Sequence, residues 1–224
     1  MTRRPFLKVC CIASPAEARL AVALGADALG LVGPMPSGPG QIPDADAARI
    51  AASVPPPTDV WLLTSRTDAG AIAAHADAVG ATTVQLVDAI QPTVYPELRQ
   101  RLPGRRLVQV VHVTGEASVA EAEAVAPSVD AVLLDSGAPG AAVPELGGTG
   151  RVHDWALSRR IVERLASLAP SVPVWLAGGL RPQNVAEAVR AVRPWGVDLC
   201  SGVRTGGTLD AAKLRAFTEA LGTA

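Results

Sequence analysis

Two groups capable of acid–base chemistry stand at the ends of apolar runs in this 224-residue chain. Asp135 ends the run 131–135, where loss of water raises the pKa of a carboxyl and holds it protonated as an acid. Cys10 lies in the run 7–12, and nearby positive charge or a helix N-terminus makes such a thiol a base. Each also has a plainer interpretation. Asp135 accepts loop N–H bonds, and Cys10 is a small core residue.

Two later apolar runs end in small residues that suit an anion. Val174–Leu180 contains Gly178 and Gly179, and Gly196–Val203 contains Ser201 and Gly202. A strand that stops at glycine and turns into a helix leaves backbone N–H groups free for a phosphate. Glycines that only permit tight turns explain the same pattern, so the sequence leaves both interpretations open.

The elements that must position these groups alternate between strand and helix. Nearly all-apolar strand runs indicate burial on both faces, as in parallel sheets covered by helices. Ser14 is expected to cap the first helix, which Pro15 begins, with Glu17 completing a capping box. Six strands are expected at 7–12, 28–32, 60–63, 83–87, 106–113 and 131–135, and two more in the stretch 174–203. Helices are expected to follow, among them 44–53, 93–102, 118–126, 155–168 and 210–221.

This order predicts an α/β protein with one domain over residues 1–224, a (β/α)₈ TIM barrel. An open doubly wound sheet is the alternative, but no Gly-x-Gly-x-x-Gly follows the first strand. Function in a barrel sits at the carboxyl ends of the strands. Asp135 and Cys10 would then flank a small substrate from different sides, while His112, at another strand end, faces solvent or a helix or serves as a ligand.

Composition excludes several kinds of partner. The 20 basic and 21 acidic residues predict no nucleic-acid or membrane partner, and 3% aromatic residues provide no stacking platform. The three cysteines, Cys10, Cys11 and Cys200, fit neither a disulfide framework nor a zinc site. No apolar run reaches the length of a membrane span. We therefore expect a cytoplasmic protein without a metal.

Short motifs along nearly the whole chain, in the same order, resemble phosphoribosylanthranilate isomerase, the enzyme of tryptophan biosynthesis. The most specific is Gly147-Gly-Thr-Gly150 followed by Asp154-Trp155 and, further on, by Leu176-Ala-Gly-Gly-Leu180. The others are Lys8-Val-Cys10, Gly25-Ala-Asp-Ala-Leu-Gly-Leu-Val32, Val84-Gln-Leu86, Leu133-Leu-Asp135-Ser136, Pro182 with Asn184-Val185, Gly196-Val-Asp198 and Ser201-Gly-Val203.

The resemblance implies an aldose–ketose isomerase, an intramolecular oxidoreductase that performs an Amadori rearrangement on an N-(5-phosphoribosyl)amine with no cofactor. It implies that Asp135 protonates the ribose ring oxygen and that Cys10 removes the C2 proton. Gly178, Gly179, Ser201 and Gly202 would bind the phosphate through backbone N–H groups. The loop 136–151, which contains the substrate-binding Gly148 and Gly150, would fold over the sugar. Monomer and homodimer both remain open.

The chain departs from this family where the amine would bind. Cys11 replaces a glycine, Gly40 stands near the place of an arginine that pairs with the anthranilate carboxylate, and Val87 replaces a histidine. These three residues and Asp198 are the possible substrate-side positions. Either another cation, such as Arg66 or Arg204, substitutes, or the chain acts on a different phosphosugar amine. A catalytically silent phosphosugar-binding barrel is the remaining alternative.

Overall fold

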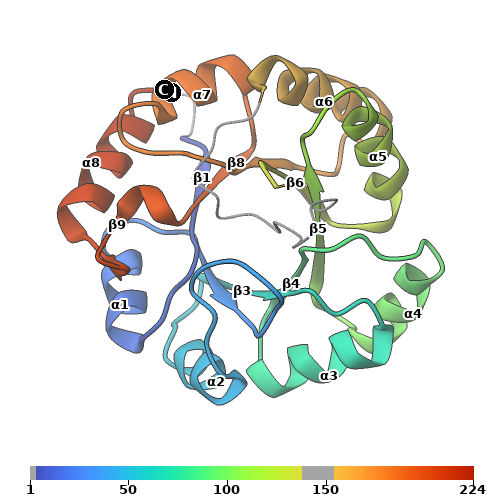
Figure 1. Cartoon of the computed structure of the whole chain (residues 1–224), viewed down its shortest axis with the longest axis horizontal. Coiled ribbons are helices and arrows are strands. Elements are labelled where there is room, and N and C mark those ends of the chain that lie inside the picture. Colours follow the sequence, from blue (N-terminus) through green and yellow to red (C-terminus); the bar gives the residue numbers. More distant parts are fainter. Residues whose placement is uncertain (1–3, 138–153) are drawn as a thin grey trace.

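The strands of the chain close into a barrel in sequence order (Figure 1). The computed structural model describes residues 4–137 and 154–224. Each strand runs parallel to its neighbours, and the last pairs with the first through Lys8 opposite Asp198. The strands are β1 (Phe6–Val9), β2 (Ala28–Val32), β3 (Asp59–Thr64), β4 (Thr83–Leu86), β5 (Arg106–His112), β6 (Ala131–Asp135), β7 (Val174–Leu176) and β8 (Gly196–Leu199).

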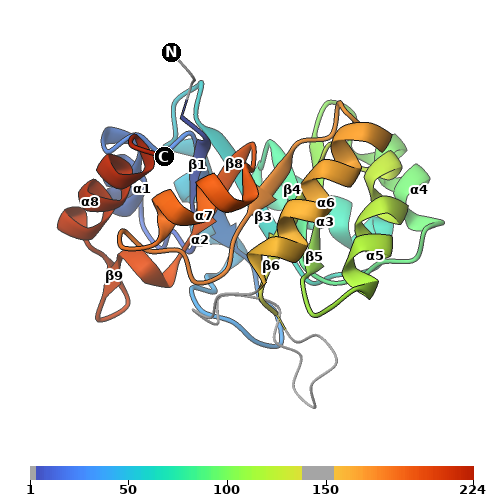
Figure 2. The ribbon, with the colours of Figure 1, turned by 90° about the horizontal axis from the view of Figure 1, so that it is seen from above.

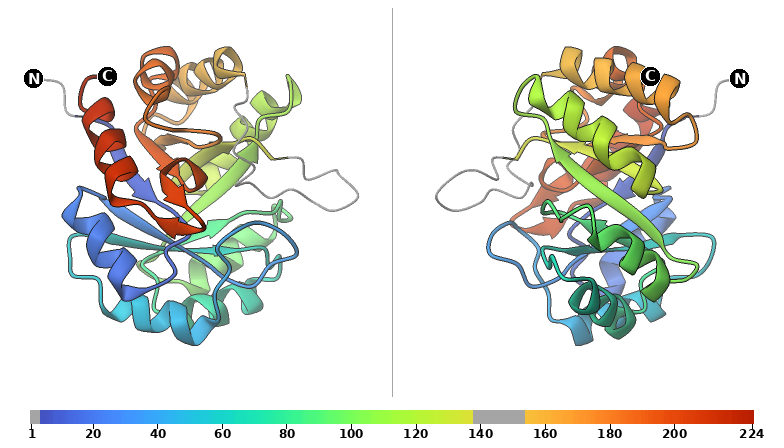
Figure 3. Two further views of the ribbon diagram at one scale, coloured as in Figure 1. Left: turned by 60° about the vertical axis from the view of Figure 1, so that its left-hand side comes forward. Right: turned by 90° about the vertical axis from the view of Figure 1, so that its right-hand side faces the viewer.

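Helices form a ring outside the strands, and the last helix lies beside the first (Figures 1 and 3). The hydroxyl of Thr218 in the last helix donates to the carbonyl of Leu24, 3.1 Å away, just after the first helix. In Figure 2 the last helix ends on the side where β1 begins. The helices are α1 (Pro15–Ala23), α2 (Asp44–Ala52), α3 (Ala69–Val79), α4 (Val94–Arg101), α5 (Ala117–Val125), α6 (Trp155–Leu168), α7 (Val185–Val192) and α8 (Ala211–Leu221).

The apolar residues divide into two clusters. The larger lies between the sheet and the helices and includes Leu7, Leu62, Ile72, Val197 and Phe217, each almost fully buried. The smaller fills the inside of the barrel. Strands buried on both faces need apolar side chains at successive positions, and the near-continuous runs of the sequence therefore became central strands.

Aromatic rings close the end of the barrel where the strands begin. Phe6 stacks on Trp195 with ring centroids 3.9 Å apart, and Trp175 meets Trp195 edge-on at 5.3 Å. Trp61 approaches Trp175 at 4.9 Å. A Cβ at Gly196 would lie 2.6 Å from the Trp175 ring, so glycine is needed there for the ring to fit.

The predicted TIM-barrel fold class is confirmed, and the differences concern ends and caps. Ser14 caps α1 as predicted, accepting from the Glu17 backbone N–H at 3.2 Å. Glu17 does not complete a capping box, because its carboxylate accepts instead from the N–H of Ala13 and of Leu209. The expected first strand ends early, at Val9, and Cys11 adopts a left-handed backbone with φ 62°. A short hairpin, β9 (Arg204–Thr205) and β10 (Thr208–Leu209), precedes α8.

The described ranges, 4–137 and 154–224, contain neither a candidate membrane span nor a candidate metal site. No helix there combines the length and the apolarity needed to cross a bilayer. No group of three or more His, Cys, Asp or Glu side chains in these ranges is arranged to hold a metal ion.

Candidate active site

A cavity opens where the strands end. It has a volume of about 650 Å³, including the part open to solvent. Its lining comes from the ends of most strands and from the loop after β2. The described residues lining it are Cys10, Cys11, Val32, Met35, Gly38, Pro39, Leu63, Gln85, Val87, Asp135, Ala177, Gly178, Gly179, Leu180, Asp198, Leu199, Cys200 and Ser201.

The barrel brings together most of the residues that sequence reasoning selected. Eight of them line this cavity: Cys10, Cys11, Val87, Asp135, Gly178, Gly179, Asp198 and Ser201. Gly202 follows Ser201 directly, and Gly40 touches Cys11. Gly148 and Gly150 lie outside the described residues. His112 does not line the cavity. It is buried, its Nε2 lies 3.2 Å from the Val87 carbonyl, and burial lowers its pKa.

Asp135 is the last residue of β6 and reaches the cavity from the wall opposite the loop after β2. Its Oδ1 accepts the backbone N–H of Ser136 at 2.7 Å. This contact is the loop N–H bond of the plainer interpretation, but the same carboxyl also lines the cavity. A carboxyl with one oxygen fixed by the backbone is oriented, and an oriented acid transfers protons more effectively than a mobile one.

The turn after β7 has the backbone that an anion site requires. Gly178 and Gly179 both have left-handed backbones, with φ 84° and 63°, which glycine adopts without steric cost. The Asn184 side chain fixes the turn by donating to the Gly179 carbonyl at 3.0 Å and accepting from the N–H of Arg181 at 2.9 Å. With the Gly179 carbonyl engaged on the helix side, the turn presents backbone to the cavity.

The turn after β8 packs directly on the turn after β7. A Cβ added to Gly202 would stand 2.1 Å from the Leu180 carbonyl oxygen, well inside van der Waals contact. Only glycine therefore lets the two turns approach so closely. Ser201 and Gly202 lie in a single 3₁₀ turn, Ser201–Val203, and Ser201 lines the cavity beside the glycine pair.

All three cysteines meet at this end of the barrel. Cys10 and Cys11 are buried and Cys200 is half-buried. Cys11 packs on Gly40, where a Cβ would lie 2.4 Å from the Cys11 Cβ, so the two positions are sterically coupled. Hydrogen bonds to Cys10 and Cys200, together with burial, raise the pKa of Cys11 well above its usual value. The Cys11 contact and Arg204 lower the pKa of Cys200 against the effect of burial.

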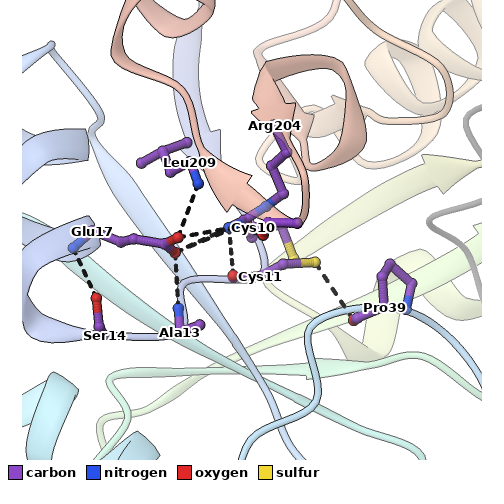
Figure 4. Close-up of polar contacts among 9 residues, drawn as sticks. Cys10, Cys11, Ala13, Ser14, Glu17, Pro39, Arg204 and Leu209 are labelled. Carbon is purple, nitrogen blue, oxygen red and sulfur yellow. Dashed lines mark hydrogen bonds and ion pairs between the residues drawn. The ribbon is translucent and has the colours of Figure 1, made fainter.

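Arg204 holds the end of β1 in place (Figure 4). Its guanidinium donates to the backbone carbonyls of Cys10 and Cys11 and forms an ion pair with Glu17 at 3.2 Å. Burial raises the pKa of Glu17, but N–H donors from Leu209 and Ala13 and the Arg204 charge outweigh it and lower the pKa. Arg204 therefore orders the loop that carries both thiols.

These contacts describe the two arginines that the sequence offered as partners for a substrate carboxylate. Arg204 was a candidate to pair with a substrate carboxylate, yet its guanidinium is engaged with Glu17 and main-chain carbonyls and does not line the cavity. Arg66, the other candidate, donates to the Ala71 carbonyl and lies 3.7 Å from Asp44. Neither arginine lines the cavity, and pairing of either one with a substrate carboxylate stays a prediction.

A buried ion pair joins the first and last strands beneath the cavity. The Lys8 ammonium lies 2.6 Å from Asp198 Oδ2, and the two side chains are 0% and 8% exposed. Burial alone would lower the Lys8 pKa, but Asp198 raises it overall, so Lys8 stays charged. Lys8 also lies 5.2 Å from the Trp61 ring centroid. Sequence reasoning placed Asp198 among the substrate-side residues but missed this partner.

Similarity to known proteins agrees with this geometry. Residues 7–220 match the family model "N-(5'phosphoribosyl)anthranilate (PRA) isomerase". The N-(5'-phosphoribosyl)anthranilate isomerase of Haloferax volcanii is 38% identical over 226 residues, covering 100% of this chain and 95% of its own.

Two solved structures add to this likeness. The phosphoribosylanthranilate isomerase of Thermotoga maritima superimposes with a TM-score of 0.81 at 28% identity, covering 97% of this chain and 98% of its own. A phosphoribosylanthranilate isomerase in complex with reduced 1-(o-carboxyphenylamino)-1-deoxyribulose 5-phosphate gives 0.79 at 26%, with the same coverage. By sequence and by fold, this chain belongs to the N-(5'-phosphoribosyl)anthranilate isomerase family.

Proposed function

We propose that this chain converts N-(5'-phosphoribosyl)anthranilate to 1-(o-carboxyphenylamino)-1-deoxyribulose 5-phosphate, a step of tryptophan biosynthesis. One observation carries the proposal: Cys10 of the β1 end and Asp135 of the β6 end line one cavity with the turns after β7 and β8. An acid, a base and an anion-binding backbone around one small space are the groups that an Amadori rearrangement requires.

Asp135 and Cys10 divide the proton transfers. Asp135 donates a proton to the ribose ring oxygen, the bond from C1 to that oxygen breaks, and a Schiff base forms. Cys10, as a thiolate, takes the C2 proton, and the electron pair left at C2 gives an enolamine. Tautomerisation of the enolamine yields the ketone. Each group of this kind accelerates a reaction about 10²–10⁴-fold.

The phosphate would be held by the turns after β7 and β8. Left-handed Gly178 and Gly179 offer backbone N–H groups without Cβ atoms in the way, and Ser201, which lines the cavity beside them, offers another. A phosphate bound there would hold the ribose between Asp135 and Cys10. The reacting groups would then already be oriented when the proton transfers begin. Gly148 and Gly150 remain proposed sugar-side residues.

The amine side of the cavity is apolar. Val32, Met35, Leu63 and Val87 line it, and an aryl ring suits these side chains. Among the described lining residues there is no lysine or arginine, and this favours, as a second candidate, a phosphosugar amine without a carboxylate. Comparing kcat/KM for phosphoribosylanthranilate and for phosphoribosylaniline separates the two. A better rate with the aniline compound supports the second candidate.

Turnover of phosphoribosylanthranilate, followed by loss of its fluorescence, tests the roles. Asp135→Asn keeps an oxygen for the Ser136 N–H but cannot donate the same proton, so kcat should fall about 10²–10⁴-fold. Cys10→Ser should do the same. Asp77→Asn, an exposed carboxylate on α3, is the matched control and should keep full turnover. Variants of Asp135 and Cys10 that retain full turnover, or a wild type without any, would refute the proposal.

We also propose that the chain is cytoplasmic and that it is a monomer or a homodimer. Three free cysteines in one chain favour a reducing cytoplasm over an oxidising compartment. A monomer or a homodimer remains the prediction for assembly, and sedimentation equilibrium would decide between them.

A further inference from the structure

Barrel closure places three thiols from distant parts of the chain side by side. β1 and β8 pair in parallel up to Val9 opposite Leu199, and the Cys10 N–H donates to the Leu199 carbonyl at 2.8 Å. Cys10 and Cys11 therefore follow the end of β1 next to Cys200, although Cys11 and Cys200 are 189 residues apart in the sequence. All three cysteines line the same cavity.

Cys11 is the central thiol of the three. Its thiol lies close enough to both Cys10 and Cys200 for each of them to raise its pKa. Adjacent residues have Cα atoms about 3.8 Å apart, too close for an unstrained disulfide, whose Cα atoms are usually about 4.4–6.8 Å apart. The strand register sets Cys10 level with Cys200, but it is the Cys11 thiol that interacts with Cys200. Cys11 and Cys200 are therefore the pair suited to bonding.

The two thiols have different chemical characters. Cys200 is half-buried and lies close to Arg204, and its pKa is lowered, first by the Cys11 hydrogen bond. A partly exposed thiol beside a cation reacts with oxidants as the thiolate. Cys11 is buried, and its pKa is raised well above its usual value, first by its contact with Cys10. This is the division between a reacting and a resolving cysteine.

We propose that Cys200 and Cys11 are a redox modification site of this chain, which hydrogen peroxide converts to a disulfide across the floor of the cavity. The Cys200 thiolate attacks peroxide, the O–O bond breaks, and a sulfenic acid forms with release of hydroxide, which is protonated to water. The Cys11 sulfur then attacks the sulfenic sulfur, the S–O bond breaks, and the Cys11 proton leaves with the oxygen as water. Two thiols and one peroxide give one disulfide and two waters.

The bond changes the site around Cys10. The Cys11 sulfur now lies 3.6 Å from the Pro39 carbonyl oxygen and must leave it to reach Cys200. This movement also frees the loop after β2, whose Gly40 packs against Cys11. Oxidation would thus disturb the apolar amine side and the base together. This loss of turnover rests on the proposed function, whereas formation of the disulfide does not.

Peroxide treatment of the full chain, followed by tryptic digestion without reductant, tests the bond. We expect the peptides 9–19 and 191–204 to be cross-linked, the intact mass to fall by about 2 Da, and the free thiols to fall from three to one. Fragmentation of the 9–19 peptide should place the bond on Cys11. Dithiothreitol should reverse the cross-link and restore a turnover that oxidation had lowered by about tenfold or more.

Serine variants separate this pair from the other pairings. Cys10→Ser should still cross-link the two peptides, while Cys11→Ser and Cys200→Ser should not. A cross-link that survives in Cys11→Ser, a bond mapped to Cys10, or irreversible oxidation of Cys200 without a cross-link would overturn the proposal. Full turnover by the cross-linked wild type would overturn the proposed effect of the disulfide on the active site. Turnover by the untreated enzyme shows separately whether the proposed function holds.

Discussion

Replacing Lys8 by methionine should strongly destabilise the barrel. Lys8 is fully buried and its ammonium lies 2.6 Å from Asp198 Oδ2. Methionine keeps most of the apolar stem of lysine but leaves Asp198 buried without a counter-charge. The Oδ1 atom of Asp198 already has no hydrogen-bond partner in the described residues. Breaking one side of a buried ion pair costs about 3–5 kcal/mol.

That cost converts to a thermal shift. For chains of 150–250 residues, each kcal/mol moves the midpoint about 2–4 °C, so Lys8→Met should unfold about 6–20 °C below the wild type. Burial raises the pKa of Asp198, although Lys8 opposes this effect, and removing Lys8 should raise it further. A carboxyl with a raised folded pKa is destabilising when ionised and gains stability as pH falls through that pKa. The gap to the wild type should therefore narrow as the pH falls.

Thermal unfolding followed by circular dichroism measures both effects. The informative partner is Lys8→Met combined with Asp198→Val, which removes both charges. Replacing a whole buried pair by apolar groups is often neutral or stabilising, so the double variant should recover most of the lost stability. A midpoint within a degree or two of the wild type in Lys8→Met, or a double variant as unstable as the two singles combined, would show that the pair does not hold β1 to β8 as argued.

Two further substitutions test the loops around the site. Glu17→Gln removes the charge that Arg204 faces and should cost about 1.5–3 kcal/mol near neutral pH. Because the folded pKa of Glu17 is lowered, its contribution is present above the ordinary value of 4.5 and is lost as pH falls through the folded pKa, so the difference in midpoints should shrink in acid. Gly202→Ala drives a Cβ into the Leu180 carbonyl and should separate the turns after β7 and β8, costing about 1–3 kcal/mol and raising KM for the phosphosugar about tenfold.

Both have direct controls. Gly115→Ala adds a Cβ in open space and should change neither stability nor KM, so an equal effect at both glycines would argue against the steric reason given for Gly202. A constant difference between Glu17→Gln and the wild type across the acid range would mean that the Glu17 charge does not act through ionisation.

The sequence predicted the barrel well because both faces of its strands are buried. Apolar runs such as 28–32 and 131–135 coincide with β2 and β6, since a strand packed on two sides leaves no polar position to obscure it. Ends were less accurate. The run 7–12 stays apolar beyond β1, but the left-handed backbone at Cys11 ends the strand at Val9, and nothing in the residue type signals that conformation.

Contacts between distant residues were beyond the reach of local patterns. Lys8 meets Asp198, and Glu17 meets Arg204, only because the last strand closes on the first. Sequence reasoning treated Glu17 as a local cap and Arg204 as a free cation, and the closed barrel pairs them instead. A lysine in the middle of a buried strand was the one available signal, because a charge so placed requires a partner.

The tryptophans are distributed unevenly between the two ends of the barrel. Three of its four tryptophans, Trp61, Trp175 and Trp195, gather where the strands begin, while the cavity lies where they end. Emission from these three indoles should therefore follow the folding of the end where the strands begin and depend little on whether the cavity is occupied. A fluorescent group attached beside Val87 would report ligand binding in the cavity. The same chain would then report folding through its tryptophans and ligand binding through the added group.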